Sequence, residues 1–359
     1  MRIKSIPIPV IIIAGGTLLA VLFTLRGYAA DLLAAKSAAA VREGRSIADI
    51  HRLTQRTARM AGSDARPYRF RGLASYGVAA EADEETRELW LAMASRDLVE
   101  ALRRNPMDGV AFRALARTAH GLKLSSEALR FAEASVKRQP ATPDNYWILA
   151  RLHEPGSEAQ TEAYAELTAL RPLLTGSVLR EVHTGAMGLD DLAPYIAKQG
   201  ATYVEWANAT TDPVLRGKIA ERGVGYVEPD SPDSQRQYGW LYYYMGLGAM
   251  EENPGEAVLW LRKATAALPD THAFQRNLGF ALLRVGKVEA AREAFVHSTN
   301  LYSDLANAAH LGLAQADEEL GNLDQALELY RRLADTPRME EWVKTRARSG
   351  IRRIERSSP

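Results

Sequence analysis

The longest apolar segment of the chain lies close to its start. Residues 6–25 carry no charged side chain, and about twenty residues of α-helix span the roughly 30 Å hydrocarbon core of a membrane. Arg2 and Lys4 precede the segment, and positive flanks are typical of the cytoplasmic side. The pattern predicts a cytoplasmic tail over 1–5 and a single transmembrane helix over 6–25. It predicts localisation to the inner (cytoplasmic) membrane, with the N-terminus cytoplasmic and the remainder periplasmic.

A cleaved signal peptide is the alternative interpretation of this segment. Gly27 and Ala29 supply small residues at the offsets that a cut after Ala29 would need. However, the apolar run exceeds the ~7–15 residues of a signal-peptide core. Arg26 also separates the run from the cleavage site. We therefore favour an uncleaved signal anchor.

Small and apolar residues recur in the remainder of the chain with a period of 34 residues. Pro106 and Pro140 stand 34 residues apart, and a proline can end one helix and start the next unit. The positions between them would let two antiparallel helices approach closely: Phe112, Leu115, Ala116, Ala119, Ala128, Ala132 and Ser135. Three consecutive units of the C-terminal half repeat the offsets: Met245-Gly246, Ala257 and Leu261; Leu278-Gly279, Ala291 and Phe295; Leu313-Ala314, Ala326 and Tyr330.

This pattern resembles the tetratricopeptide repeat (TPR), a helix-turn-helix unit of the same period. Phe112 takes the large aromatic place of the first helix and Ala128 the small crossing place of the second. The resemblance covers 109–142 and 239–338 most clearly. It implies an all-α fold in which an N-terminal transmembrane helix is followed by a TPR-like helical-repeat solenoid, as in a membrane-anchored member of this superfamily.

The composition of the other segments completes the predicted organisation. Gly62, Pro67, Gly72 and Gly77 favour a loop over 62–77. Bases and aromatics alternate over 66–71, as in a surface loop, an interfacial segment or a nucleic-acid strip, of which we favour the first. The predicted parts are 26–77, a juxtamembrane helical stalk and loop; 78–172, N-terminal repeats; 173–238, a degenerate helical connector; 239–338, C-terminal repeats; and 339–359, a capping helix and tail.

Charge and residue types exclude several classes of function. Lys+Arg 45 against Asp+Glu 44 gives a net charge of +1, far less basic than a nucleic-acid binder. The chain has no cysteine, which excludes disulfides, thiolate metal sites and cysteine nucleophiles. No two histidines stand three or four residues apart, and no nucleophile elbow or phosphate-binding loop is present. We therefore predict that the protein is not an enzyme, with no catalytic residue, metal site or cofactor and no nucleic-acid partner.

The TPR resemblance implies that the first helix of each unit lines a concave surface that grips another protein. Aromatic and arginine side chains are the usual composition of binding hot spots. The predicted partner-binding residues are Arg113, Arg117, Trp147 and Arg151 in the N-terminal array and Trp240, Tyr243, Tyr244, Arg276, Asn277, Phe280 and Arg284 in the C-terminal array.

The predicted function is that of a membrane-anchored scaffold for protein–protein interaction. Its topology resembles that of accessory proteins in bacterial envelope assembly, namely pilus or exopolysaccharide machinery or cytochrome maturation. Its partners would be proteins of a membrane-associated complex. Two alternatives remain at this stage: a fixed structural subunit of a membrane complex, and an enzyme whose site lies within 173–238.

Overall fold

The computed structural model describes residues 64–183, 187–303, 308–337 and 339–357, together with Arg52 and Gln55. The predicted cytoplasmic tail and transmembrane helix, and nearly all of the predicted stalk, lie outside these residues. Within the described residues, no helix combines the length and the apolar composition needed to cross a bilayer. The chain divides into two compact units, 1–170 and 171–359, and each is described by itself.

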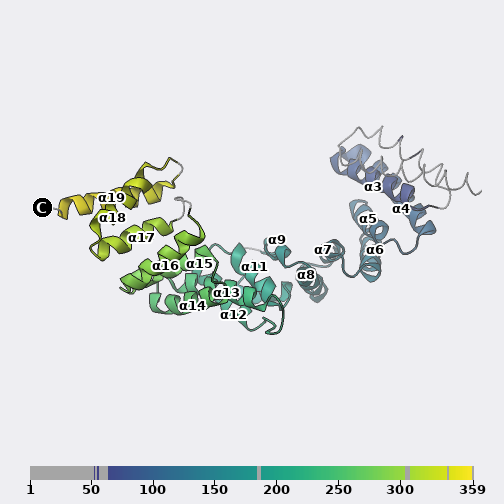
Figure 1. Ribbon diagram of the computed structural model, residues 1–359. Helices are drawn as coiled ribbons and strands as arrows, with labels where there is room; N and C mark the ends of the chain where they lie inside the picture. The colour runs from purple at the N-terminus through teal and green to yellow at the C-terminus, as the bar shows by residue number, and fades with distance from the viewer. Residues whose placement is uncertain are drawn as a thin grey trace, which may run out of the picture. The chain divides into compact units, whose positions relative to one another are not determined.

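The described part of the first unit is a run of helical hairpins (Figure 1). Side-chain caps start two of its helices, since Asp83 accepts a hydrogen bond from the Thr86 amide and Asp108 from that of Ala111. Its helices are α3 (Arg66–Glu81), α4 (Glu84–Arg104), α5 (Gly109–Gly121), α6 (Ser125–Arg138), α7 (Pro143–Leu152) and α8 (Glu158–Leu170).

The prediction of a loop over 62–77 is wrong, because α3 runs through most of that range. Pro67 occupies the first turn of α3, where a helix needs no amide donor. Gly72 serves close packing, since a Cβ on it would lie 2.6 Å from Cγ of Leu98 in α4. The boundary predicted after Gly77 therefore falls inside a helix that pairs with α4.

The alternating bases and aromatics over 66–71 are used within the first unit. Arg71 donates to both carboxylate oxygens of buried Asp97, at 2.5 and 2.6 Å. The guanidinium of Arg104 lies 4.0 Å from the ring centroid of Tyr68. These contacts join α3 to α4, so the segment is a packed helix rather than a nucleic-acid strip.

The second unit holds the larger helical array. Its elements are η1 (Pro172–Leu174), α9 (Thr175–Val182), α10 (Leu189–Leu192), η2 (Ala193–Tyr195), α11 (Gly200–Ala209), α12 (Pro213–Val224), α13 (Ser234–Ala249), α14 (Pro254–Ala267), α15 (His272–Arg284), α16 (Val288–Leu301), α17 (Ala309–Glu319), α18 (Leu323–Asp335) and α19 (Glu341–Ser357).

The predicted repeat register is confirmed by the packing of this array. Ala257, Ala291 and Ala326 lie in the first turn of the second helices at intervals of 34 and 35 residues, and all three are fully buried. A Cβ on Gly246 would lie 2.6 Å from Cγ of Leu261. In the next pair, a Cβ on Gly279 would lie 2.6 Å from Cε1 of Phe295, which has the same offset as Leu261. Small residues at these offsets let the two helices of each pair cross closely.

The segment predicted as a degenerate connector, 173–238, is instead part of the array. Its helices α11 and α12 form a pair that packs on α13. Gly217 of α12 meets Gly248 of α13 so closely that a Cβ on Gly248 would lie 2.9 Å from Cα of Gly217. Trp206 and Ile219 share one continuous core with residues of α13 to α17. The short lengths of α11 and α12, and the glycine contact between α12 and α13, hide the repeat pattern of this segment in the sequence.

The helix α19 packs against α18. Val343, Ala347 and Ile354 are buried on one face of it, against Tyr330 and Leu333 of α18. This second apolar cluster is separate from the core that runs from α9 to α17.

Candidate functional site

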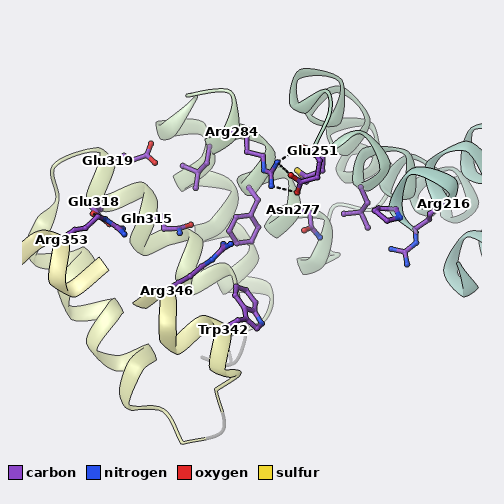
Figure 2. Close-up of a pocket in the computed structure, with 15 residues that line it drawn as sticks. Arg216, Glu251, Asn277, Arg284, Gln315, Glu318, Glu319, Trp342, Arg346 and Arg353 are labelled. Carbon is purple, nitrogen blue, oxygen red and sulfur yellow. Dashed lines mark hydrogen bonds and ion pairs between the residues drawn. The ribbon is translucent and has the colours of Figure 1, made fainter. Parts of the chain in front are cut away.

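An open cavity of about 970 Å³ lies along the first helices of successive pairs in the second unit. We call it the inner groove. It is lined from the end of α13 and the turn that follows by Leu247, Met250 and Glu251; from α15 by Asn277, Phe280, Leu283 and Arg284; from α17 by Gln315, Glu318 and Glu319; and from α19 by Trp342, Arg346 and Arg353, with Pro213 and Arg216 of α12 also in the lining. Figure 2 shows the labelled side chains of α15, α17 and α19, among them Arg284, Gln315 and Trp342, around this space. A groove of this size accommodates a short peptide or a comparable ligand.

Two bidentate ion pairs stand in the wall of the inner groove. Arg284 donates to both oxygens of Glu251, at 2.6 and 2.7 Å, so α15 is tied to the end of α13. Arg353 donates to both oxygens of Glu318 at 2.8 Å, and this pair ties α19 to α17. The hydrogen bonds from Arg284 lower the pKa of the Glu251 carboxyl, which is therefore ionised at neutral pH. Both pairs hold neighbouring repeats together.

Aromatic side chains supply the apolar part of the inner groove. Phe280 is half-buried, and its ring meets that of Phe295 edge-on with centroids 4.9 Å apart. Trp342 is 45% exposed and donates its indole N–H to Glu340. The guanidinium of Arg346 lies 5.6 Å from the Trp342 ring centroid. An exposed tryptophan beside a half-buried phenylalanine is the composition of an interaction site.

A second cavity of about 340 Å³ adjoins the inner groove. It shares Asn277, Phe280 and Trp342 with the groove and adds Arg276 and Glu340 to the lining. The structure therefore gathers the four sequence-predicted residues of α15, Arg276, Asn277, Phe280 and Arg284, around two cavities that share lining residues.

Tyr243 is a predicted site residue that the structure places in the core. It is 8% exposed, its ring stacks on Phe274 with centroids 4.5 Å apart, and its hydroxyl accepts a hydrogen bond from Asn277 at 2.9 Å. Burial raises the pKa of the Tyr243 hydroxyl. Tyr243 therefore does not line an open surface, because its ring fills the space between α13 and α15.

Trp240 and Tyr244 line a different cavity, of about 400 Å³, formed with residues of α11. Tyr244 is only 5% exposed, and burial raises the pKa of its hydroxyl to about 12. That hydroxyl donates to the Asn208 side chain at 3.2 Å. Trp240 meets Phe274 edge-on at 5.0 Å. These two residues are largely packing groups and lie outside the inner groove.

The four predicted residues of the first unit lie on α5 and α7. Arg113 donates to Asn145 at 2.9 Å, and burial together with the charge of Arg117 lowers its pKa. Trp147 packs edge-on against the buried ring of Tyr164, with centroids 6.0 Å apart. Arg117 and Arg151 are exposed. They remain predictions for a binding surface of the first unit.

Sequence reasoning missed the contributions of α12 and α19. The predicted residues do not include Arg216 of α12. They also omit Trp342 and Arg346 of α19, because the apolar period of that helix predicts capping alone. One signal is present in the sequence: Trp342 and Arg346 stand four residues apart, away from the apolar face formed by Val343 and Ala347.

Among the described residues, no three histidine or carboxylate side chains come together as metal ligands. The neighbouring acids Asp190 and Asp191 have different partners, since Asp190 accepts from Arg222 at 2.6 Å and Asp191 from the Gly188 amide at 2.8 Å.

Comparison with known proteins gives similarity at the level of structure alone. No protein-family model matches the sequence, and no curated protein matches it. The chain is similar to a chain of the APC/C hetero-tetramer Cut9–Hcn1, at 17% identity and a TM-score of 0.39, over 90% of this chain and 55% of that one. It therefore spans about half the length of that relative.

Two further solved structures resemble the chain. One is PilW, a widely conserved type IV pilus biogenesis factor, at 14% identity and a TM-score of 0.32, over 76% of this chain and 97% of that one. The other is TTC0263, a thermophilic TPR protein of Thermus thermophilus, at 17% identity and a TM-score of 0.25, over 78% and 98%. The fold assignment rests on the chain's own helix packing: the described residues form helices and connecting segments, and α13 to α18 pack as TPR-like pairs.

Proposed function

We propose that the protein is a scaffold whose second unit binds an extended segment of a partner protein in the inner groove. The observation that carries this proposal is an open cavity of about 970 Å³ lined by successive first helices, with an exposed tryptophan in its wall. A groove built from repeats can follow an extended chain, because each helix pair presents one more set of side chains along it.

A displayed library of random peptides, selected on the full chain, tests this proposal. Gln315 lies in the groove wall on α17, and Gln315→Trp would fill the space. Gln325 is exposed on α18 and is not among the lining residues, so Gln325→Trp is the matched control. We expect selected peptides to bind the control as they bind the wild type and to bind Gln315→Trp at least tenfold more weakly. Equal binding to both variants would refute the groove as the site.

We also propose that residues 6–25 anchor the scaffold in the inner membrane, with the described units periplasmic. The support is the uncharged run of 6–25 and the flanking positive charges of Arg2 and Lys4. A reporter active only in the periplasm, fused after Pro359, should give signal. Signal from a cytoplasm-only reporter at that position would reverse the topology.

With this topology the partner would be a protein of a bacterial envelope complex, such as pilus, exopolysaccharide or cytochrome-maturation machinery. A photo-crosslinking residue at position 315, in intact membranes, would couple to that partner. The same residue at position 325 serves as the control. Coupling to an envelope protein only from position 315 supports the assignment, whereas coupling only to proteins of other compartments contradicts it.

A further inference from the structure

Two aromatic side chains stand where the inner groove meets its smaller neighbour. Phe280 comes from α15 and Trp342 from α19, and both line the cavity of about 970 Å³ and the cavity of about 340 Å³. These helices are not adjacent in the array, because α17 lies between them in chain order. Both rings therefore border both cavities.

An arginine lies on each side of this aromatic pair. Arg346 lines only the larger cavity and Arg276 only the smaller one. Arg276 stands four residues before Phe280, and Arg346 stands four residues after Trp342, so each shares a helix face with its aromatic at roughly 5–6 Å between Cβ atoms. Figure 2 shows Trp342 and Arg346 side by side in the groove wall.

The other two arginines of α15 and α19 in the groove wall already have carboxylate partners. Arg284 is held by Glu251, and Arg353 is held by Glu318, each through two hydrogen bonds. Their charge is neutralised inside the wall. They fix the positions of α13, α15, α17 and α19 and offer little to a ligand.

Arg276 and Arg346 differ from these, because neither forms an ion pair with a carboxylate of the described residues. Only one carboxylate outside the two ion pairs lines each cavity, namely Glu319 in the larger and Glu340 in the smaller. Glu340 already accepts a hydrogen bond from Trp342. Two guanidiniums without carboxylate partners, on either side of an apolar pair, are complementary to an apolar group between two anions.

We propose that the inner groove recognises an extended acidic segment of another protein in which a large apolar residue lies between two carboxylates. The apolar side chain packs between Phe280 and Trp342, and the carboxylates pair with Arg276 and Arg346. An extended chain advances about 3.3–3.6 Å per residue. Carboxylates two residues before and after the apolar residue therefore match the spacing of each arginine from its aromatic. The proposal rests on the function proposed above and specifies its ligand.

The test is the sequence preference of peptides selected on the full chain, followed by charge reversal. The expected consensus is acidic, any residue, large apolar, any residue, acidic. A selected peptide of this form should bind Arg276→Glu and Arg346→Glu at least tenfold more weakly than the wild type, and more so at low salt. Replacing one of its acids by lysine should restore binding to the matching variant and weaken binding to the wild type. Arg352, exposed on α19 and absent from both cavity linings, supplies the control Arg352→Glu.

Each outcome separates this inference from the function on which it rests. Groove-dependent peptides without flanking acids, or unchanged binding to both arginine variants, overturn the acidic ligand and leave the scaffold function intact. If no selected peptide depends on the inner groove for binding, both the acidic ligand and the scaffold function are overturned. Equal weakening by Arg352→Glu assigns the effect to general charge and overturns the pairing. Circular dichroism and the melting temperature establish folding, and Arg276→Gln and Arg346→Gln replace any glutamate variant that unfolds.

Discussion

Phe295 of α16 is wedged between two glycines, and this contact allows a sharp test of the repeat packing. The side chain is fully buried. A Cβ on Gly279 of α15 would lie 2.6 Å from Cε1 of the ring, and one on Gly312 of α17 would lie 2.2 Å from Cζ. The ring is confined on both sides, so it cannot move away from a new methyl group at either position. We predict that Gly279→Ala destabilises the protein, although alanine is the better helix former.

Two opposing effects set the change in free energy of unfolding that Gly279→Ala causes. Replacing glycine by alanine within a helix contributes about 1 kcal/mol of stability through helix propensity. Overpacking a core costs about 1–3 kcal/mol. Three ring atoms of Phe295 would lie within 2.8 Å of the new Cβ, closer than ordinary carbon contacts, so we take the upper end of that range. The net loss in free energy of unfolding is then about 2 kcal/mol. For a unit of this size it lowers the melting temperature by roughly 4–8 °C.

The assay is thermal and urea unfolding of the full chain followed by circular dichroism. Gly255→Ala is the control, because a Cβ on Gly255 of α14 would meet only one atom within 4 Å, at 3.7 Å. It should leave the melting temperature unchanged or slightly higher. Phe295→Leu with Gly279→Ala should lose at least 1 kcal/mol less than the sum of the two single variants. Additive losses in free energy of unfolding, or a stabilising effect of Gly279→Ala, would refute the confinement of the Phe295 ring between the two glycines.

Three further predictions concern other parts of the fold. Ala291→Trp should lower the melting temperature clearly because Ala291 is fully buried, whereas exposed Glu293→Ala should change it little. Asp97→Ala should cost the first unit about 3 kcal/mol, measured by urea unfolding, since it leaves Arg71 without its buried partner. Burial raises the pKa of the Tyr244 hydroxyl to about 12. Its contribution to the free energy of unfolding is therefore complete below pH ~10 and is lost as the pH rises to about 12. Tyr244→Phe should reduce this alkaline loss of stability, measured by urea unfolding as a function of pH.

The repeat positions could be predicted from the sequence because close helix crossing permits few residue types. Ala257, Ala291 and Ala326 recur at one offset, and each is fully buried where two helices cross. The same reasoning explains Gly246 and Gly248 as packing residues. Gly246 meets Leu261, and Gly248 meets Gly217 of α12, so both glycines allow close helix packing.

The errors in the prediction come from residues with two physical uses. Glycine and proline favour loops, yet Pro67 starts α3 and Gly72 lets it approach Leu98. In the same way, an aromatic residue on the first helix of a unit can face a ligand or fill the core. The pattern could not separate Tyr243, which stacks on Phe274, from half-buried Phe280, because burial depends on the helix that packs opposite.

The contribution of α19 to the site could not be derived from the periodicity of its own sequence. Its apolar face predicts capping, which the structure shows through Val343 and Ile354. The groove side of the same helix depends on how far the array curves between α15 and α19. That curvature is the sum of small rotations at each helix pair, and no single residue encodes it.

The two apolar clusters of the second unit divide the inner groove between them. Helices α13 and α15 belong to the core that extends from α9 to α17, whereas α18 and α19 pack on a smaller cluster around Tyr330. In repeat proteins, helices at one end can open while the rest stays folded. Opening of α18 and α19 would remove Trp342 and Arg346 from the groove and leave Phe280 in place. Ligand occupancy should therefore slow amide hydrogen exchange most strongly in the last two helices, which couples capture of a partner to the folding of the chain's end.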